Sequence, residues 1–312
     1  MILSHTSLPK EKFSLKTMII TTSVLGLLAL YATTIFGLNV LMMVGVSYLS
    51  ALIIEFMFAK GRKRPLDSGW FVNPMILALV LPPTSTWWMV MIGSMFGTFY
   101  GKAIFGGTGR NIFHPAAVGW VFLAFAFPNL MLTNWLNPVS GDIVTTATPL
   151  IQLNAGLTPY PFTWMALLMG NHAGSVGETF RLGIIVLGLV LIVLKAIDWR
   201  IPFFYLGTVF VINYVGIMLG GEKFFDPVLS IFVGGLMFAA FFMASDPITS
   251  PYHPYAKIIY GCGLGIITVI IRNFAAFPEG AMFAILIMNA IAPLLDSMKI
   301  NRKFIKQGEV IV

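Results

Sequence analysis

Two blocks of membrane-type sequence are separated by the polar stretch Asp142-Ile143-Val144-Thr145-Thr146-Ala147-Thr148-Pro149-Leu150. The stretch divides the chain, because the sequence on either side of it is rich in long apolar runs. Of the 312 residues, 58% are hydrophobic and only 10% are charged. This composition lies far outside that of soluble domains. The chain is therefore expected to cross a membrane many times.

Ten apolar runs approach the length that crosses about 30 Å of hydrocarbon at about 1.5 Å per residue. The predicted spans are 17–37, 39–59, 69–83, 87–105, 112–132, 178–197, 201–220, 226–244, 256–273 and 279–296. The third is short and has Pro74 near its start and Pro82-Pro83 at its end, which predicts a broken or tilted crossing. The predicted fold is an all-α polytopic membrane protein with about ten transmembrane helices.

Lysine and arginine predict the side of the membrane on which each loop lies. With a cytoplasmic N-terminus, sixteen of the nineteen basic residues fall on the inner side, and the exceptions are Arg181, Lys223 and Arg272. Both termini are therefore predicted to be cytoplasmic, and residues 133–177 to lie on the outer face. The first sixteen residues show no signal-peptide cleavage pattern and are expected to be retained. The net charge of +7 fits attraction to anionic lipid and indicates no nucleic-acid partner.

The second block repeats features of the first. Asn73-Pro74 followed by Pro82-Pro83-Thr84-Ser85 recurs as Asp226-Pro227 followed by Asp246-Pro247-Ile248-Thr249-Ser250, and a glycine-spaced span comes next in each block. Five spans per half imply that the halves are inverted. The predicted domains are a first five-helix repeat at 1–132, an outer loop at 133–177, and a second repeat with a cytoplasmic C-terminus at 178–312. Inverted repeats are also typical of transporters, so a small-solute channel or transporter is the alternative of another class.

The glycines Gly93, Gly97 and Gly101 are spaced by four residues, which predicts close helix packing. Charged residues in or near spans allow more than one interpretation. Glu55 is a functional candidate because of its depth in the second span, but it could also snorkel or pair with the basic cluster at 60–64. Span-end carboxylates are expected to act as caps or interface residues, and no ion pathway is assigned to them. They are Glu178, Asp226, Asp246 and Glu279.

Cysteine and histidine limit the redox centres that this chain can hold. Cys262 is the only cysteine, which excludes a four-thiolate iron–sulfur site made by this chain alone. The four histidines are scattered, so no bis-histidine haem, no metal site and no catalytic residue is predicted. A flavin is the redox centre that the sequence supports.

The polar stretch has features of a covalent flavin site. A threonine hydroxyl in an exposed, extended segment can be joined to the phosphate of FMN. Ala147 leaves room for the modifying enzyme, and Pro149 keeps Thr148 out of the α region. The alternative is a loop whose threonines bond their own backbone.

A second informative stretch is Gly106-Gly107-Thr108-Gly109-Arg110-Asn111-Ile112-Phe113-His114-Pro115-Ala116-Ala117. Glycines before a helix start can present free N–H groups to a phosphate. The spacing is neither that of a P-loop nor that of a dinucleotide fingerprint, so no nucleoside triphosphate is expected.

Both stretches resemble motifs of two related subunits: the B subunit of the sodium-translocating NADH:quinone reductase and the D subunit of the Rnf electron-transport complex. The first is similar to the flavinylation motif Asp-x-x-[Ser/Thr]-Gly-Ala-Thr, with Thr146 in the glycine position. The second is similar to the run Gly-Gly-x-Gly-x-Asn-x-Phe-Asn-Pro-Ala, with His114 in place of the second asparagine. The length and short N-terminus fit the D subunit better, and the B subunit is the alternative.

The resemblance implies that Thr148 carries covalent FMN. Thr145, Thr146, Ala147 and Asp142 would then orient the loop or serve recognition by a flavin transferase. It also implies a second, noncovalent flavin, riboflavin, near Gly107, Gly109, Arg110, Asn111 and His114. The expected function is electron relay in the cell inner membrane, as one subunit of an ion-translocating ferredoxin:NAD oxidoreductase. Its partners would be the other membrane and peripheral subunits of the complex, and it would not be catalytic alone.

Overall fold

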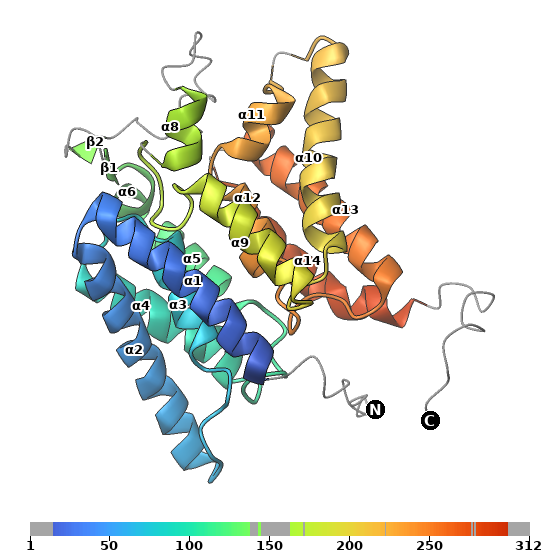
Figure 1. Ribbon diagram of the computed structural model, residues 1–312. Helices are drawn as coiled ribbons and strands as arrows, with labels where there is room; N and C mark the ends of the chain where they lie inside the picture. Colours follow the sequence, from blue (N-terminus) through green and yellow to red (C-terminus); the bar gives the residue numbers. More distant parts are fainter. Residues whose placement is uncertain are drawn as a thin grey trace.

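The computed structural model describes residues 15–137, 143–144, 163–170, 172–221, 223–275, 277 and 279–298. The first block contains α1 (Leu15–Phe36), α2 (Asn39–Gly61), α3 (Val72–Val80), α4 (Trp87–Thr98), the π-helix η2 (Phe99–Ala103), α5 (Pro115–Ala126) and α6 (Pro128–Leu132). The second contains α8 (Trp164–Met169), α9 (Arg181–Val193), α10 (Arg200–Met218), α11 (Pro227–Phe232), α12 (Leu236–Phe238), the π-helix η3 (Ala239–Met243), α13 (Pro254–Phe274) and α14 (Ala281–Ser297). Two short strands, β1 (Trp135–Leu136) and β2 (Ile143–Val144), pair antiparallel. The predicted all-α class is confirmed (Figure 1).

Four helices, α1, α2, α10 and α13, are long and apolar enough to cross a membrane. Helices α5, α9 and α14 are shorter but also apolar. Large apolar side chains such as Leu219 (82% exposed) and Val193 (78% exposed) point away from the protein, as expected for lipid-facing positions. The chain is thus a multi-pass membrane protein. Every predicted span contains at least one helix, and the number of crossings stays a prediction.

The predicted span 226–244 is not one continuous helix. It is divided into α11, α12 and η3, with a break at Val233-Gly234-Gly235 where Gly234 has a φ of +69°. A glycine pair supplies this conformation because it has no Cβ to clash. The carboxylate of Asp226 begins the segment as predicted for a cap, accepting hydrogen bonds from the N–H groups of Val228 (3.0 Å) and Leu229 (2.9 Å).

Glycines bring the helices of the first block into close contact, as the four-residue spacing predicted. A Cβ atom at Gly97 would clash with the carbonyl oxygen of Pro115, and one at Gly101 would lie 2.6 Å from the Cα of Pro115. Helix α4 and η2 therefore pack directly on the backbone of α5. Helix α13 uses Gly261 and Gly265 in the same way against α10.

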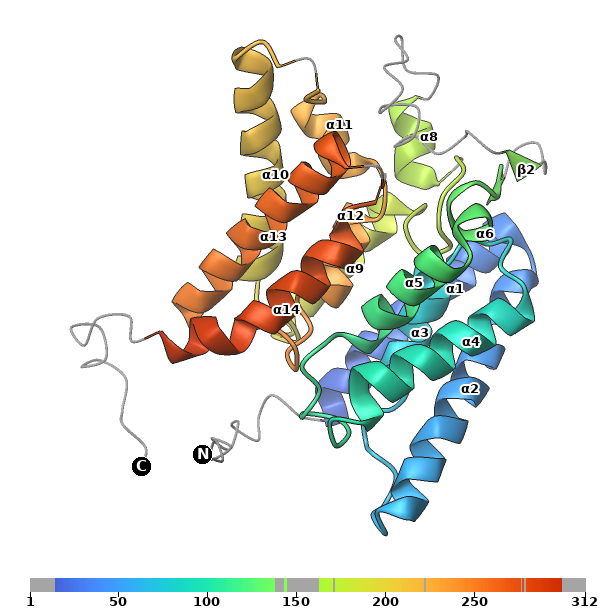
Figure 2. The ribbon, with the colours of Figure 1, turned by 180° about the vertical axis from the view of Figure 1, so that it is seen from behind.

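The two blocks meet along two pairs of helices, α1 with α9 and α5 with α14. Figures 1 and 2 show the blue-to-green helices on one side and the yellow-to-red helices on the other. The last turns of α2 and α9 and the first turn of α1 lie at one end of the molecule. The β1–β2 pair, α6 and α8 lie at the opposite end.

Candidate functional site

The five residues predicted for flavin attachment, Asp142, Thr145, Thr146, Ala147 and Thr148, lie outside the described residues. Of the polar stretch, the structure describes Ile143 and Val144, which form β2. In the β1–β2 pair, Trp135 is opposite Val144 and Leu136 is opposite Ile143, so Thr145 follows directly after a paired residue. The hydroxyl of Thr84 donates a hydrogen bond to the carbonyl of Asn134 at 2.7 Å, which ties β1 to the loop before α4. The two described residues of the polar stretch, Ile143 and Val144, thus lie with β1 at one end of the molecule (Figures 1 and 2).

The glycine-rich loop lies at the other end of α5, about 18 Å away along the twelve residues of that helix. Gly106, Gly107 and Gly109 all have positive φ angles, of +117°, +100° and +88°. The N–H group of Thr108 donates to the carboxylate of Asp67 at 2.6 Å. A side chain at Gly107 would collide with that same carboxylate. Asp67 therefore occupies the space in front of the loop that a phosphate would need.

The remaining residues of this loop differ in their exposure and in their hydrogen bonds. Arg110 is exposed. The side chain of Asn111 accepts from the N–H of Gly109 and donates to the carbonyl of Phe113, both at 3.3 Å, so it closes the loop on itself. His114 is fully buried, and neither of its ring nitrogens has a hydrogen-bond partner among the described residues. Of the predicted second site, His114 and Arg110 are the residues that offer unused hydrogen-bonding groups.

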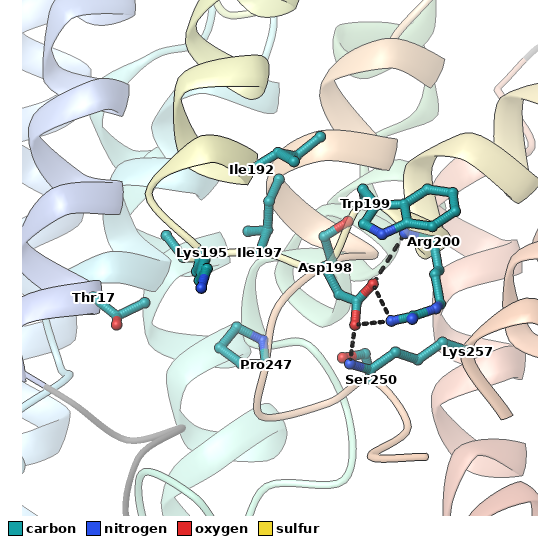
Figure 3. A pocket seen from close by; sticks show the side chains of 12 residues that line it. Thr17, Ile192, Lys195, Ile197, Asp198, Trp199, Arg200, Pro247, Ser250 and Lys257 are labelled. Atoms are coloured by element: carbon teal, nitrogen blue, oxygen red, sulfur yellow. Dashed lines mark hydrogen bonds and ion pairs between the residues drawn. The ribbon is translucent and has the colours of Figure 1, made fainter. Parts of the chain in front are cut away.

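A cavity of about 400 Å³ lies between α1, the α9–α10 loop and the segment before α13. Figure 3 shows Asp198, Arg200 and Lys257 together on one side and Lys195 and Thr17 on the other. The Nζ of Lys257 lies 2.5 Å from the Asp198 carboxylate, and Nη1 of Arg200 lies 3.2 Å from it.

Asp198 is held in its charged form by these neighbours. Burial raises the pKa of Asp198, but the hydrogen bond from Lys257 and the charges of Lys257 and Arg200 outweigh that effect. The pKa of the carboxyl therefore lies below its ordinary value. At neutral pH the cavity wall holds one carboxylate that is fully engaged by two cations.

Two buried arginines donate hydrogen bonds to backbone carbonyls beside the helix break at Val233–Gly235. Arg181 donates to the carbonyl of Phe232, and Arg272 donates to the carbonyls of Ser230 (2.9 Å) and Val233 (3.3 Å). These are carbonyls at the C-terminal end of α11, which lack partners within the helix. Positive charge is also favoured there by the helix dipole.

Two glutamates lie at the other side of the same break. The N–H of Gly235 donates to Glu279 at 2.9 Å, and a Cβ at Gly235 would lie 3.1 Å from Oε2 of Glu178. Nη2 of Arg272 lies 3.7 Å from Glu279. Carboxylates thus face the N-terminal side of α12, where the dipole favours negative charge.

This network was only partly predicted. The glutamates were expected to be caps or interface residues, but the arginines were counted as loop charges. Most lysines and arginines are predicted to lie on the inner side, and these two arginines are exceptions. That exception was the sequence signal that they are not ordinary loop charges.

Of the interpretations given for Glu55, the structure shows pairing, but with another partner than expected. It pairs with Lys102 at 2.5 Å rather than with the cluster at 60–64, and both side chains are buried. Pairing is confirmed, whereas the expected partner was wrong, because Lys102 extends from η2 into the protein.

Comparison with known proteins gives a consistent assignment. The sequence matches the family described as NQR2, RnfD, RnfE over residues 4–305. The D subunit of the Na(+)-translocating ferredoxin:NAD(+) oxidoreductase complex of Acetobacterium woodii is 37% identical over 267 residues, which cover 84% of this chain and 81% of the relative. The D subunit of the proton-translocating complex of Clostridium ljungdahlii is 35% identical over 294 residues, covering 88% of this chain and 87% of the relative. The B subunit of the Na(+)-translocating NADH-quinone reductase of Ectopseudomonas mendocina is 37% identical over 261 residues, covering 78% and 62%. The chain belongs to the NQR2, RnfD, RnfE family.

Proposed function

We propose that this chain is the D-type membrane subunit of an Rnf-type, ion-translocating ferredoxin:NAD oxidoreductase and relays electrons through FMN attached to Thr148. The observation that carries the proposal is the Asp142–Thr148 motif in a chain that matches the family over residues 4–305. Bound FMN would supply one-electron redox chemistry, and the protein would hold and orient it. The work of the complex would require the other subunits.

Relative length favours the D subunit over the B subunit. The chain covers 81% and 87% of the two D subunits, but only 62% of the B subunit of Ectopseudomonas mendocina. A larger part of the B subunit than of either D subunit therefore has no matching segment in this chain. The two D subunits differ in the ion that their names give, Na⁺ for Acetobacterium woodii and the proton for Clostridium ljungdahlii.

A second flavin at the glycine-rich loop is a narrower proposal. Asp67 accepts the N–H of Thr108 and lies against Gly107, so its negative charge occupies the place that a phosphate would need, which argues against a second FMN. Riboflavin has no phosphate, and it would need only ring and hydroxyl partners. His114, with two unpartnered buried nitrogens, and the exposed Arg110 are the groups that we assign to it.

We also infer that the two blocks are inverted repeats within ten crossings. Five helical segments in α1 to α5, the third of them the short helix α3, correspond in order to α9, α10, the α11–η3 segment, α13 and α14, where the third is broken into short pieces. The inter-block contacts join equivalent helices, α1 with α9 and α5 with α14, as a two-fold relation would require. Figure 1 draws α1 and α9 in opposite directions. Repeat boundaries at 132 and 178 fit this arrangement.

The test is flavin fluorescence of the protein band in a denaturing gel, after expression with a flavin transferase. Wild type should fluoresce and Thr148→Val should be dark, because valine keeps the shape of threonine but lacks the hydroxyl that forms the phosphoester. Thr158→Val is the matched control, because Thr158 also precedes a proline in the predicted outer loop but lies outside the motif, and it should keep the fluorescence.

A dark wild-type band, beside a control protein that is modified in the same cells, would contradict the proposal and favour the transporter interpretation. A Thr148→Val band that still fluoresces would contradict attachment at Thr148.

A further inference from the structure

The cavity drawn in Figure 3 plays no part in the proposed electron relay. Its wall comes from segments far apart in sequence: Thr17 at the start of α1, the α9–α10 loop, and residues 245–257. It lies at the end of the molecule where α2 and α9 end, opposite the β1–β2 pair (Figures 1 and 2). At about 400 Å³ it is large enough for a phosphate and the glycerol attached to it.

The charge of the cavity wall is unbalanced. Lys195, Arg200 and Lys257 face a single carboxylate, Asp198, which leaves an excess of two positive charges. Lys257 is 7% exposed and is engaged by Asp198. Lys195 forms no ion pair with any of the described residues, and it is exposed. A concave site with this imbalance attracts an anion.

The backbone of Lys195 has a conformation that usually belongs to glycine. Its φ is +56°, and it ends α9 with hydrogen bonds from its own N–H to Ile192 and from the N–H of Ala196 to Leu191. Glycine is favoured at this position because a side chain crowds the following carbonyl. A lysine here is therefore less favourable for the helix end than glycine would be.

Apolar side chains place the cavity at the edge of the bilayer. Val193, Leu194 and Trp199 are 78%, 53% and 48% exposed, and they flank the cavity at the ends of α9 and α10. Exposed aliphatic groups belong in hydrocarbon, whereas tryptophan favours the headgroup level. The basic cavity therefore sits where the phosphates of the neighbouring leaflet lie.

We propose that this cavity binds the phosphate of an anionic phospholipid headgroup. Lys195 and Arg200 hold the phosphate oxygens, and the Ser250 hydroxyl lies on the same wall. Asp198 keeps Lys257 and Arg200 in place beneath them. The acyl chains leave across Val193 and Leu194 into the bilayer.

The structure contains a matched control for this site. Lys63 ends α2 with the same geometry, a φ of +51° and hydrogen bonds to Lys60 and from Arg64 to Ala59, but it lines no part of this cavity. Lys195→Gly and Lys63→Gly remove the same charge at the same type of helix end. Glycine fits both positions without strain, so both variants should fold.

The experiment is native mass spectrometry of the purified full chain with phosphatidylglycerol, phosphatidylcholine or inorganic phosphate. We expect one phosphatidylglycerol to be retained by wild type and by Lys63→Gly. Lys195→Gly should weaken that retention by about fivefold or more, the contribution of one lysine at an anionic surface.

Three results would overturn the proposal. Equal losses in both variants would show attraction to general surface charge rather than a site. Equal retention of phosphatidylcholine would remove the anionic preference. Inorganic phosphate that binds as tightly as phosphatidylglycerol, and that is lost in Lys195→Gly, would assign the cavity to a soluble phosphate instead of a lipid.

Discussion

Lys102 and Glu55 form an ion pair that is almost fully removed from solvent. Their side chains are 2% and 6% exposed, and Nζ and Oε1 lie 2.5 Å apart. The mutual attraction offsets the loss of hydration only while both charges are present. Removal of one partner from a buried pair costs about 3–5 kcal/mol when the other charge is left uncompensated. Asp67, 4.0 Å from Nζ of Lys102, would remain near that lysine if Glu55 were lost.

We therefore predict that Lys102→Met and Glu55→Gln each lower the apparent melting temperature of the protein in detergent. The double variant Glu55→Gln/Lys102→Met should be more stable than the sum of the two losses predicts. Lys60→Met, at an exposed position of α2, is the control and should change stability by less than about 0.5 kcal/mol. Additive losses in the double variant would show that the pair does not act as a unit.

At the scale of helices, glycine decides which surfaces touch. A methyl group at Gly97 would collide with the carbonyl oxygen of Pro115, which belongs to the backbone of α5 and cannot move aside. Gly45 in α2 has no neighbouring atom within 4 Å of the position that a Cβ would take. Gly97→Ala should therefore destabilise the protein by about 1–3 kcal/mol, the usual cost of overpacking.

Gly45→Ala makes the same chemical change in an open helix position. It should be neutral or stabilising by up to about 1 kcal/mol, since alanine is the better helix former. The two variants are compared by melting temperature in detergent. Equal effects at both positions would show that the α4–α5 contact does not depend on the glycine.

The elements differ in how far the sequence predicts them. The packing of α4 on α5 was predictable, because the four-residue glycine spacing is a local pattern. The break between α11 and α12 was not, because the groups that stabilise it come from distant segments: Arg181, Arg272 and Glu279. Gly234-Gly235 was the local sign of a break. The pair of Glu55 with Lys102 was missed for the same reason, since 47 positions separate them.

At the scale of the whole molecule, the buried arginines change the count of basic residues on the two predicted sides of the membrane. Arg181 and Arg272 are two of the three basic residues that fall outside the inner side, and both bind backbone carbonyls inside the protein. They are not loop charges, so they say nothing about which side a loop occupies. Only Lys223 then remains as an outer basic residue. The orientation with residues 133–177 outside stays a prediction.

That orientation predicts a labelling pattern. In a Cys262→Ser background, a cysteine is placed at Lys223 or at Arg64, both of which are exposed. In right-side-out membrane vesicles, a membrane-impermeant maleimide should label Lys223→Cys at once and Arg64→Cys only after the vesicles are opened. The Cys262→Ser protein without a new cysteine gives the background. The reverse pattern would contradict the predicted topology. It would place Thr148 on the cytoplasmic side and the basic residues Lys60, Arg62 and Lys63 on the outer side.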